Sequence, residues 1–207
     1  MSPQIKSKRR VQDHGEVFTN EKEVKAMLDL VKDESIRIDS TFLEPAAGTG
    51  NFLVEILKRK LKTVRTKYSH DQEAYELNAF IAVTSMYGID ILEDNCSECR
   101  RRLMNIISNQ YKRLYKGEVK QTFLNTIEFV LAKNIIHGDG LTGLKEGIHA
   151  DGIMFSEWNL DGREVTRKNY AMNDMIAYEG IKDEKNNIPK ARMIYPKVDF
   201  LKVSMYE

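Results

Sequence analysis

The segment Glu44-Pro45-Ala46-Ala47-Gly48-Thr49-Gly50-Asn51-Phe52 decides the fold. A short apolar run, Thr41-Phe42-Leu43, precedes it, and apolar residues at helical spacing follow it, namely Leu53, Ile56, Leu57, Leu61 and Val64. This order is typical of a strand, a glycine-bearing turn and a helix. The two glycines let the backbone approach a ligand closely, and the helix start offers free N–H groups and a positive dipole end.

The same alternation continues along the chain to about residue 145. Helices are predicted over 21–32, 71–86 and 93–116 and again around 123–131, with strands at 86–91 and 134–139. Strands that alternate with helices indicate a parallel, doubly wound α/β sheet, in which ligands bind at the carboxyl ends of the strands. We therefore expect a Rossmann-like sheet over residues 1–150, with a helix at its N-terminal side.

The pattern changes beyond residue 150. Residues 153–160, the pair Asp161-Gly162 and residues 163–170 read as a β-hairpin around a two-residue turn. The segment from 183 onward is polar and holds two of the four prolines, so we expect it to be extended or loosely attached. The predicted organisation is a domain over 1–150, a β-hairpin extension over 151–182 and a polar tail over 183–207.

Composition limits the classes of function. The 207 residues include 32 Lys and Arg against 31 Asp and Glu, a formal charge of +1, which removes any global electrostatic argument for binding nucleic acid or membranes. Contact with DNA would need local patches or a partner. No apolar run approaches the roughly 18 residues of a membrane span, and there are only two cysteines, so we expect a soluble cytoplasmic protein with reduced thiols.

Acidic residues end all three predicted strands of the first 150 residues. Glu44 suits an ammonium group, because a carboxylate would repel phosphates and no Lys-Ser or Lys-Thr follows Gly50 as a P-loop requires. Asp90 is placed to accept both hydroxyls of a ribose, and Asp139 to accept from the exocyclic amine of an adenine whose faces Ile91 and Leu141 would cover. An ammonium, a ribose and an adenine together describe S-adenosylmethionine.

Four segments, in order, resemble motifs of the S-adenosylmethionine-dependent DNA adenine-N6 methyltransferases of restriction-modification systems: HGEVFTN, FLEPAAGTGNFL, YGIDI and IIHGDGL. The resemblance covers about residues 11–145. It implies that Phe18 and Thr19 close over the methionine end of the cofactor. It further implies that the pocket is completed by Glu44, Ala46, Gly48, Gly50, Asn51, Phe52, Asp90, Ile91, Asp139 and Leu141.

The chain departs from this family at the catalytic motif. The family holds and stacks the flipped target base with an Asn/Asp/Ser-Pro-Pro-Tyr/Phe motif. The prolines here are Pro3, Pro45, Pro189 and Pro196, so the 207 residues contain no Pro-Pro pair. We interpret the chain as the cofactor-binding component of a split enzyme, in which a second chain supplies the motif and DNA recognition. The alternative is a non-catalytic cofactor-binding regulator or a degenerate methyltransferase fragment.

The family's topology also implies a strand order of third, second, first. The first strand then lies open at its outer edge unless the hairpin of residues 153–170 or another chain covers it. The alternation of the hairpin and its basic second strand favour another chain as the cover.

Several other features have a structural and a functional interpretation. Ser156-Glu157-Trp158-Asn159 could replace the catalytic motif, but a Trp in a strand is more often packing. The glycine turn alone could serve only tight packing. Cys96 and Cys99 could form a redox pair or half a zinc site, but their place on an apolar helical stripe favours packing. Finally, two groups of cations could contact phosphate, although a solvated face is favoured: Arg100, Arg101, Arg102, Lys112, Arg113 and Lys116, and Arg163, Arg167 and Lys168 of the hairpin.

Overall fold

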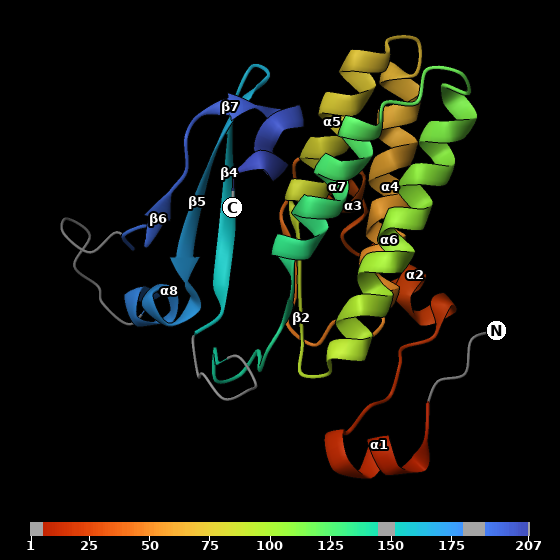
Figure 1. The fold of residues 1–207 in the computed structure, drawn as a ribbon. Helices are drawn as coiled ribbons and strands as arrows, with labels where there is room; N and C mark the ends of the chain where they lie inside the picture. Colours follow the sequence, from red (N-terminus) through yellow and green to blue (C-terminus); the bar gives the residue numbers. More distant parts are fainter. Residues whose placement is uncertain (1–5, 145–151, 180–188, 207) are drawn as a thin grey trace.

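The computed structural model describes residues 6–144, 152–179 and 189–206. Two sheets lie side by side, a parallel one covered by helices and an antiparallel one next to it (Figure 1). The helices are α1 (Lys8–His14), α2 (Glu21–Asp29), α3 (Lys32–Ile36), α4 (Asn51–Tyr68), α5 (Gln72–Thr84), α6 (Glu93–Leu114), α7 (Gln121–Asn134), α8 (Met172–Glu179) and the 3-10 helix η1 (Phe200–Met205). The strands are β1 (Phe42–Glu44), β2 (Met86–Asp90), β3 (Ile135–His137), β4 (Met154–Asp161), β5 (Glu164–Ala171), β6 (Met193–Ile194) and β7 (Val198–Asp199).

The parallel sheet has the order β1-β2-β3, as the strand order expected from sequence requires. Phe42 is in register with Met86, and Gly88 with Ile135. The central strand β2 is the most buried of the three, because a neighbouring strand covers each of its edges. Within the described residues β1 pairs only with β2, so its outer edge is open and Leu43 is 51% exposed.

Four long helices form the main core with this sheet. The apolar stripes predicted for α4, α5, α6 and α7 are the buried faces, and fully buried leucines and aromatic rings from all four meet there. The capping box of Asn20 and Glu23 starts α2 as predicted, and the helix expected over 21–32 is present up to Asp29. A separate short helix, α3, begins at Lys32. No helix in the described parts of the chain is long and apolar enough to cross a bilayer.

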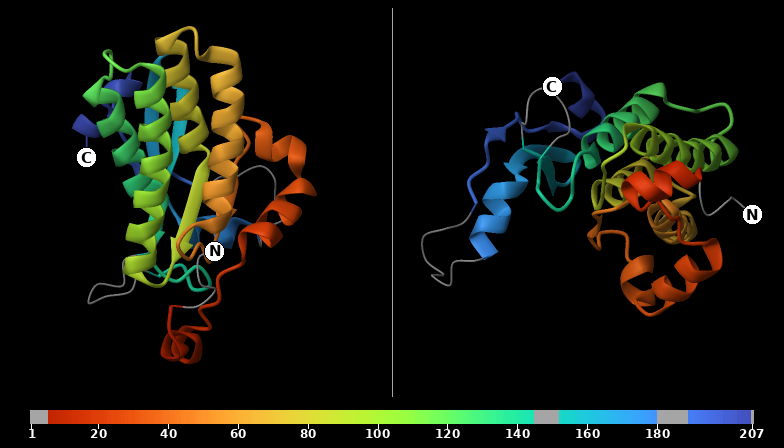
Figure 2. Two further views of the ribbon diagram at one scale, coloured as in Figure 1. Left: turned by 90° about the vertical axis from the view of Figure 1, so that its right-hand side faces the viewer. Right: turned by 90° about the horizontal axis from the view of Figure 1, so that it is seen from below.

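The predicted hairpin is present as β4 and β5, with Gly162 in the left-handed conformation at the turn. One face of this hairpin packs on α7, where Trp158 and Val165 join the main core. A smaller cluster centred on Ile89 and Ile153 joins the parallel sheet to the start of the hairpin. The hairpin therefore lies beside β2, β3 and α7 and does not pair with β1, which excludes it as the cover of the open edge (Figure 2).

The expectation of a loosely attached tail is wrong for the residues that the structure describes. Val198–Asp199 pairs with β5, and Phe200 and Val203 of η1 are buried against α7. Phe200 also contacts the ring of Phe80, with 5.3 Å between the ring centroids. The average polarity of the tail concealed two apolar side chains that bury enough surface to anchor it. Residues 183–188 lie outside the described residues, and the predicted domain boundaries stay a prediction.

Candidate functional site

The glycine turn between β1 and α4 requires glycine at two positions. Gly48 and Gly50 have φ of +54° and +84°, in the left-handed region that other residues rarely adopt. A Cβ at Gly48 would lie 3.0 Å from the ring of Phe18, and a Cβ at Gly50 would lie 2.4 Å from Sγ of Cys99. The turn is therefore packed tightly from two sides. No side chain caps α4, so its first N–H groups remain available to a ligand.

Asp90 ends β2 with its carboxylate turned toward the glycine turn. The Gly48 N–H donates to Oδ2 at 2.7 Å, and the Leu92 N–H and the Asn95 side chain donate to Oδ1 at 2.9 and 3.1 Å. A carboxylate has about four acceptor positions, and these bonds occupy three of them. One position on Oδ2 remains for a ligand hydroxyl. Asp90 thus holds the turn in place, a role that the sequence did not suggest, and has less capacity for ribose than the two bonds expected.

Glu44, at the end of β1, is the least engaged of the three acidic strand ends. Its Oε1 accepts a long hydrogen bond of 3.3 Å from the N–H of Ala46, and no cation pairs with it among the described residues. Burial raises the pKa of this carboxyl, and the Ala46 hydrogen bond offsets the rise only in part. A half-buried carboxylate without a cation favours a positively charged ligand group beside it.

The N-terminal segment meets the glycine turn, as the sequence predicted. The ring of Phe18 lies against Gly48, and the Asn51 side chain donates to the carbonyl of Thr19 at 2.8 Å. Arg102 of α6 fastens the same place, because its Nη1 donates to the Thr49 carbonyl at 2.7 Å and to Oδ1 of Asn51 at 2.8 Å. Phe52 is half-buried in the first turn of α4, and Ala46 is exposed.

Asp139 follows β3 and stabilises its own loop. Its carboxylate accepts from the Leu141 N–H at 2.8 Å and from the Thr142 hydroxyl at 2.9 Å, and the Leu141 hydrogen bond is the main cause of a lowered pKa. A Cβ at Gly140 would lie 2.5 Å from the Pro45 carbonyl, so the turns after β3 and β1 are adjacent. Leu141 is 94% exposed at this edge of the sheet.

Ile91 directly follows β2 at the same carboxyl edge of the sheet. It is half-buried, and its carbonyl is 3.0 Å from Nε2 of His137, which links the loop after β2 to the end of β3. The residues selected from the sequence are thus gathered at the carboxyl edge of one sheet.

Sequence reasoning missed a polar network behind Asp90. The buried Asn95 donates to Glu16 at 2.8 Å as well as to Asp90, and Arg10 of α1 donates to Glu16 at 2.7 Å. Burial raises the pKa of Glu16, but the hydrogen bonds from Arg10 and Asn95 outweigh it and lower the pKa. This network ties the N-terminal segment to Asp90. The signal available in the sequence was the spacing of Asn95, Cys99 and Leu103 at i, i+4 and i+8, which places Asn95 on the buried face of α6.

Trp158 lies away from this edge of the sheet, and the two cysteines are closed to solvent. Trp158 of β4 is buried against α7, and its Nε1 donates to the side chain of Asn134, the residue before β3. Trp158 therefore lies at the opposite edge of the sheet from Asp139. Burial raises the pKa of the Cys96 and Cys99 thiols to about 12, so neither thiolate forms near neutral pH. The packing interpretation is confirmed for Trp158 and both cysteines.

Some cations of the two predicted groups are engaged within the protein, and others are exposed to solvent. Arg100 donates to the Ile135 carbonyl at 2.7 Å and Arg101 pairs with Glu98, so with Arg102 the whole run is engaged within the protein. Arg167 is buried with its guanidinium 3.6 Å from the ring centroid of Tyr195, which removes it as a phosphate contact. Lys112, Arg113 and Lys116 remain exposed.

A parallel sheet of this order, a glycine turn leading into a helix and acidic residues at the strand ends define a Rossmann-like domain of the methyltransferase class. The family model described as MmeI, DNA-methyltransferase domain, matches residues 6–146, and the chain belongs to this family of restriction-modification DNA methyltransferases. The match covers the parallel sheet and the helices around it. Comparison with curated proteins and with solved structures gives no match.

Proposed function

We propose that the carboxyl edge of the parallel sheet binds S-adenosylmethionine and that the chain is the cofactor-binding component of a DNA adenine-N6 methyltransferase. The observation that carries this is the half-buried Glu44, which has no cation partner among the described residues and lies next to the uncapped start of α4. An amino-acid end has both an ammonium for Glu44 and a carboxylate for the N–H groups of the helix start.

The remaining residues suit the rest of that molecule. Asp90 has one acceptor position left for a ribose hydroxyl, and Asp139 and Leu141 lie at the neighbouring strand end for the adenine. Phe18 and Thr19 close the turn from the side of the N-terminal segment. When bound, the cofactor supplies a methyl group on a sulfonium as the electrophile, and the chain's residues orient it and exclude water around it.

We further propose that the target-base motif and DNA recognition come from a polypeptide outside these 207 residues, with a second protein chain as the preferred source. The support is chemical: the sequence has no Pro-Pro pair, and Trp158, the residue considered as a substitute for stacking, is buried at the opposite edge of the sheet. Neither a Pro-Pro motif nor Trp158 is therefore available in this chain to hold an adenine amine beside the methyl donor.

Calorimetric titration tests the cofactor site with three ligands. S-adenosylmethionine and S-adenosylhomocysteine have the amino-acid end, whereas methylthioadenosine lacks it. We expect Glu44→Gln to weaken the first two about tenfold or more, on the order of 1.5–3 kcal/mol for a charged hydrogen bond, and to leave methylthioadenosine unchanged. Asp90→Asn should weaken all three. The exposed hairpin residue Asp161 provides the control, Asp161→Asn.

The proposal fails if none of the three ligands binds the folded chain, or if Glu44→Gln weakens methylthioadenosine as much as S-adenosylmethionine. Transfer of labelled methyl groups to DNA tests the second part. The chain alone should transfer none, and activity should appear when a polypeptide with the Pro-Pro motif is added. Methylation by the purified chain alone would refute the missing-component proposal while leaving the cofactor site intact. Cofactor binding without complementation would favour the regulator.

A further inference from the structure

Charge is unevenly distributed over the helices that cover the parallel sheet. Residues 56–70, most of α4 and the turn after it, contain six Lys and Arg and no Asp or Glu. Residues 99–117, the larger part of α6, also contain six Lys and Arg and no acid. The two helices pack against each other, as Figure 1 shows, and the Gln110 side chain of α6 donates to the Leu61 carbonyl of α4. A chain with a net charge of +1 thus has one strongly cationic face.

Some of these cations are already used within the protein, and the rest are not. The engaged cations are the buried Lys60, Arg59, which pairs with Asp29 and Glu55, and the three arginines of the run 100–102. The others are exposed and have no carboxylate partner among the described residues: Lys58, Lys62, Arg65, Lys67, Lys112, Arg113 and Lys116. Exposed cations without a carboxylate partner form the electrostatic footprint of a surface that binds polyanions.

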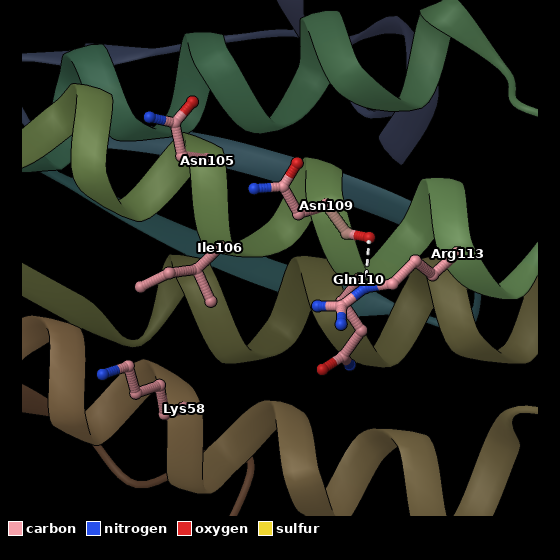
Figure 3. A pocket seen from close by; sticks show the side chains of 6 residues that line it. All are labelled: Lys58, Asn105, Ile106, Asn109, Gln110 and Arg113. Carbon is pink, nitrogen blue, oxygen red and sulfur yellow. Dashed lines mark hydrogen bonds between the residues drawn. The ribbon is translucent and has the colours of Figure 1, made fainter.

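A shallow groove of about 320 Å³ runs between the two helices at this face. Figure 3 shows Lys58 on the α4 side and the α6 residues along the other side. The lining residues are Lys58, Asn105, Ile106, Asn109, Gln110 and Arg113. The exposed side-chain amides of Asn105 and Asn109 have no hydrogen-bond partner among the described residues, so they are free to donate to phosphate or sugar oxygens.

We propose that this groove, with the cations Lys58, Lys62 and Arg65 of α4, Lys112 and Arg113 of α6 and Lys116 in the turn after α6, binds the phosphate backbone of double-stranded DNA. Lys58, Lys62 and Arg65 recur at i, i+4 and i+7, so they share one side of α4. From Asn105 to Arg113 the contacts extend roughly 12 Å along α6 at 1.5 Å per residue. That length matches several successive phosphates at about 3.4 Å per nucleotide, rather than one free phosphate.

The surface fits DNA better than an anionic membrane. Membrane-binding helices insert large apolar side chains beside their cations. Among the groove residues the one apolar side chain is Ile106, and it is half-buried between the helices. Side-chain amides and cations, which make up the rest of the lining, are the groups that position duplex DNA without reading its sequence. The choice of DNA as the ligand rests on the proposed function. The cationic surface itself is observed independently of that function.

Fluorescence anisotropy with a labelled 20-base-pair duplex at 50–200 mM NaCl tests the proposal with the full chain. The variant combines Lys58→Gln, Arg65→Gln and Arg113→Gln. The matched control combines Lys22→Gln, Lys190→Gln and Lys202→Gln, three exposed cations away from the groove. We expect the first variant to bind about tenfold more weakly at 50 mM NaCl, and its slope of log affinity against log salt to be shallower by about 3, roughly 0.9 per phosphate contact.

The control should match the wild type. A wild-type slope near zero, an equal loss in the control, or an unchanged slope in the groove variant would overturn the proposal. Stronger binding to phosphatidylserine vesicles than to the duplex, lost in the same variant, would assign the surface to a membrane instead. Titration with S-adenosylmethionine separates this proposal from the previous one: absence of cofactor binding refutes the cofactor site, and a failed salt dependence refutes only the groove.

Discussion

At the scale of single residues, the glycine turn has two roles: it lets a ligand approach the backbone, and it packs tightly against α6. Gly50 is constrained twice, by a left-handed backbone and by the Sγ atom of Cys99, and the two constraints have different causes. The first is the conformational strain of the left-handed backbone, which any residue with a Cβ would have to bear. The second is a tertiary contact with α6. Because Sγ of Cys99 occupies the space where a Cβ would lie, only glycine fits at position 50.

Gly50→Ala should therefore destabilise the protein and weaken cofactor binding. The left-handed backbone alone costs about 1–3 kcal/mol for a residue with a Cβ, and the contact with Cys99 adds a steric penalty. Urea denaturation measures the free energy of unfolding, and calorimetry measures binding. Gly117→Ala is the control, since Gly117 has no left-handed φ and nothing lies within 4 Å of the position of its Cβ. If both variants unfold at the same urea concentration, the turn is not constrained as described.

The same scale shows why part of the site could be predicted. Glu44, Asp90 and Asp139 follow apolar strand runs directly, so the parallel topology alone places them at one edge. Asn95 contacts Glu16, which lies 79 positions away in the sequence. Arg102 contacts Asn51 and Thr49, which lie 51 and 53 positions away. Only the folded chain brings such pairs together, because no local pattern specifies which distant partner a polar side chain meets.

At the scale of elements, α4 has two roles, one at its N-terminus and one at its middle. Its N-terminus lies at the carboxyl edge of the sheet, while Lys60 in its middle is fully buried near the start of β1 and β2. The Lys60 ammonium donates to the carbonyls of Ile38 and Ser40 and to the hydroxyl of Ser85. These bonds join the helix to the segments that lead into the first two strands. Burial lowers the pKa of Lys60 from 10.5 to about 7.

Lys60 should make stability rise with pH. The folded pKa is about 7 and the unfolded value is 10.5, so between these values the unfolded state binds more protons. The free energy of unfolding therefore increases as the pH rises from about 7 toward 10, and the penalty of burying a charged ammonium is fully present below pH 7. Thermal unfolding of Lys60→Met should show a flatter pH dependence across this window than the wild type.

The exposed neighbour Lys62 provides the control, and Lys62→Met should keep the wild-type pH dependence. The slope, rather than the absolute stability, is the readout, since Lys60→Met also leaves two carbonyls and a hydroxyl without their donor. Identical slopes for the wild type and Lys60→Met would show that the buried ammonium keeps its ordinary pKa.

Elements also show where a sequence pattern was insufficient. The hairpin was predicted because alternation and the Asp161-Gly162 turn are local signals. Its position on α7 depends on Trp158 bonding to Asn134 and on Arg167 stacking on aromatic rings, which are tertiary contacts. The tail was misjudged for the same reason: Phe200 becomes an anchor only because β5 and α7 offer a place to bury it.

At the scale of the whole molecule, the parallel sheet has one open edge, the outer edge of β1, among the described residues. The hairpin, the tail and α7 together cover the region beyond β3, and the helices cover one face of the parallel sheet. No described strand lies outside β1. The N–H and C=O groups along its outer edge are thus available for pairing, and the exposed Leu43 adds an apolar border.

The open edge should make the purified chain self-associate. A second copy can pair its own β1 there in the absence of the complementary polypeptide, and a charged side chain at the border would oppose that pairing. Chromatography with light scattering should show a dimer or larger species for the wild type at tens of micromolar. Leu43→Lys should shift the population toward monomer, with an apparent dissociation constant raised about tenfold or more, equivalent to about 1.4 kcal/mol.

Leu30→Lys is the matched control, because Leu30 is 86% exposed at the end of α2 and lies on no strand edge. A general effect of added charge on solubility would change both variants alike, whereas edge pairing would respond only to Leu43→Lys. Addition of the polypeptide with the catalytic motif should replace the self-associated species by a defined heteromer, since both compete for the same edge. A wild-type chain that stays monomeric at every concentration and ignores that polypeptide would show that the edge of β1 is protected in some other way.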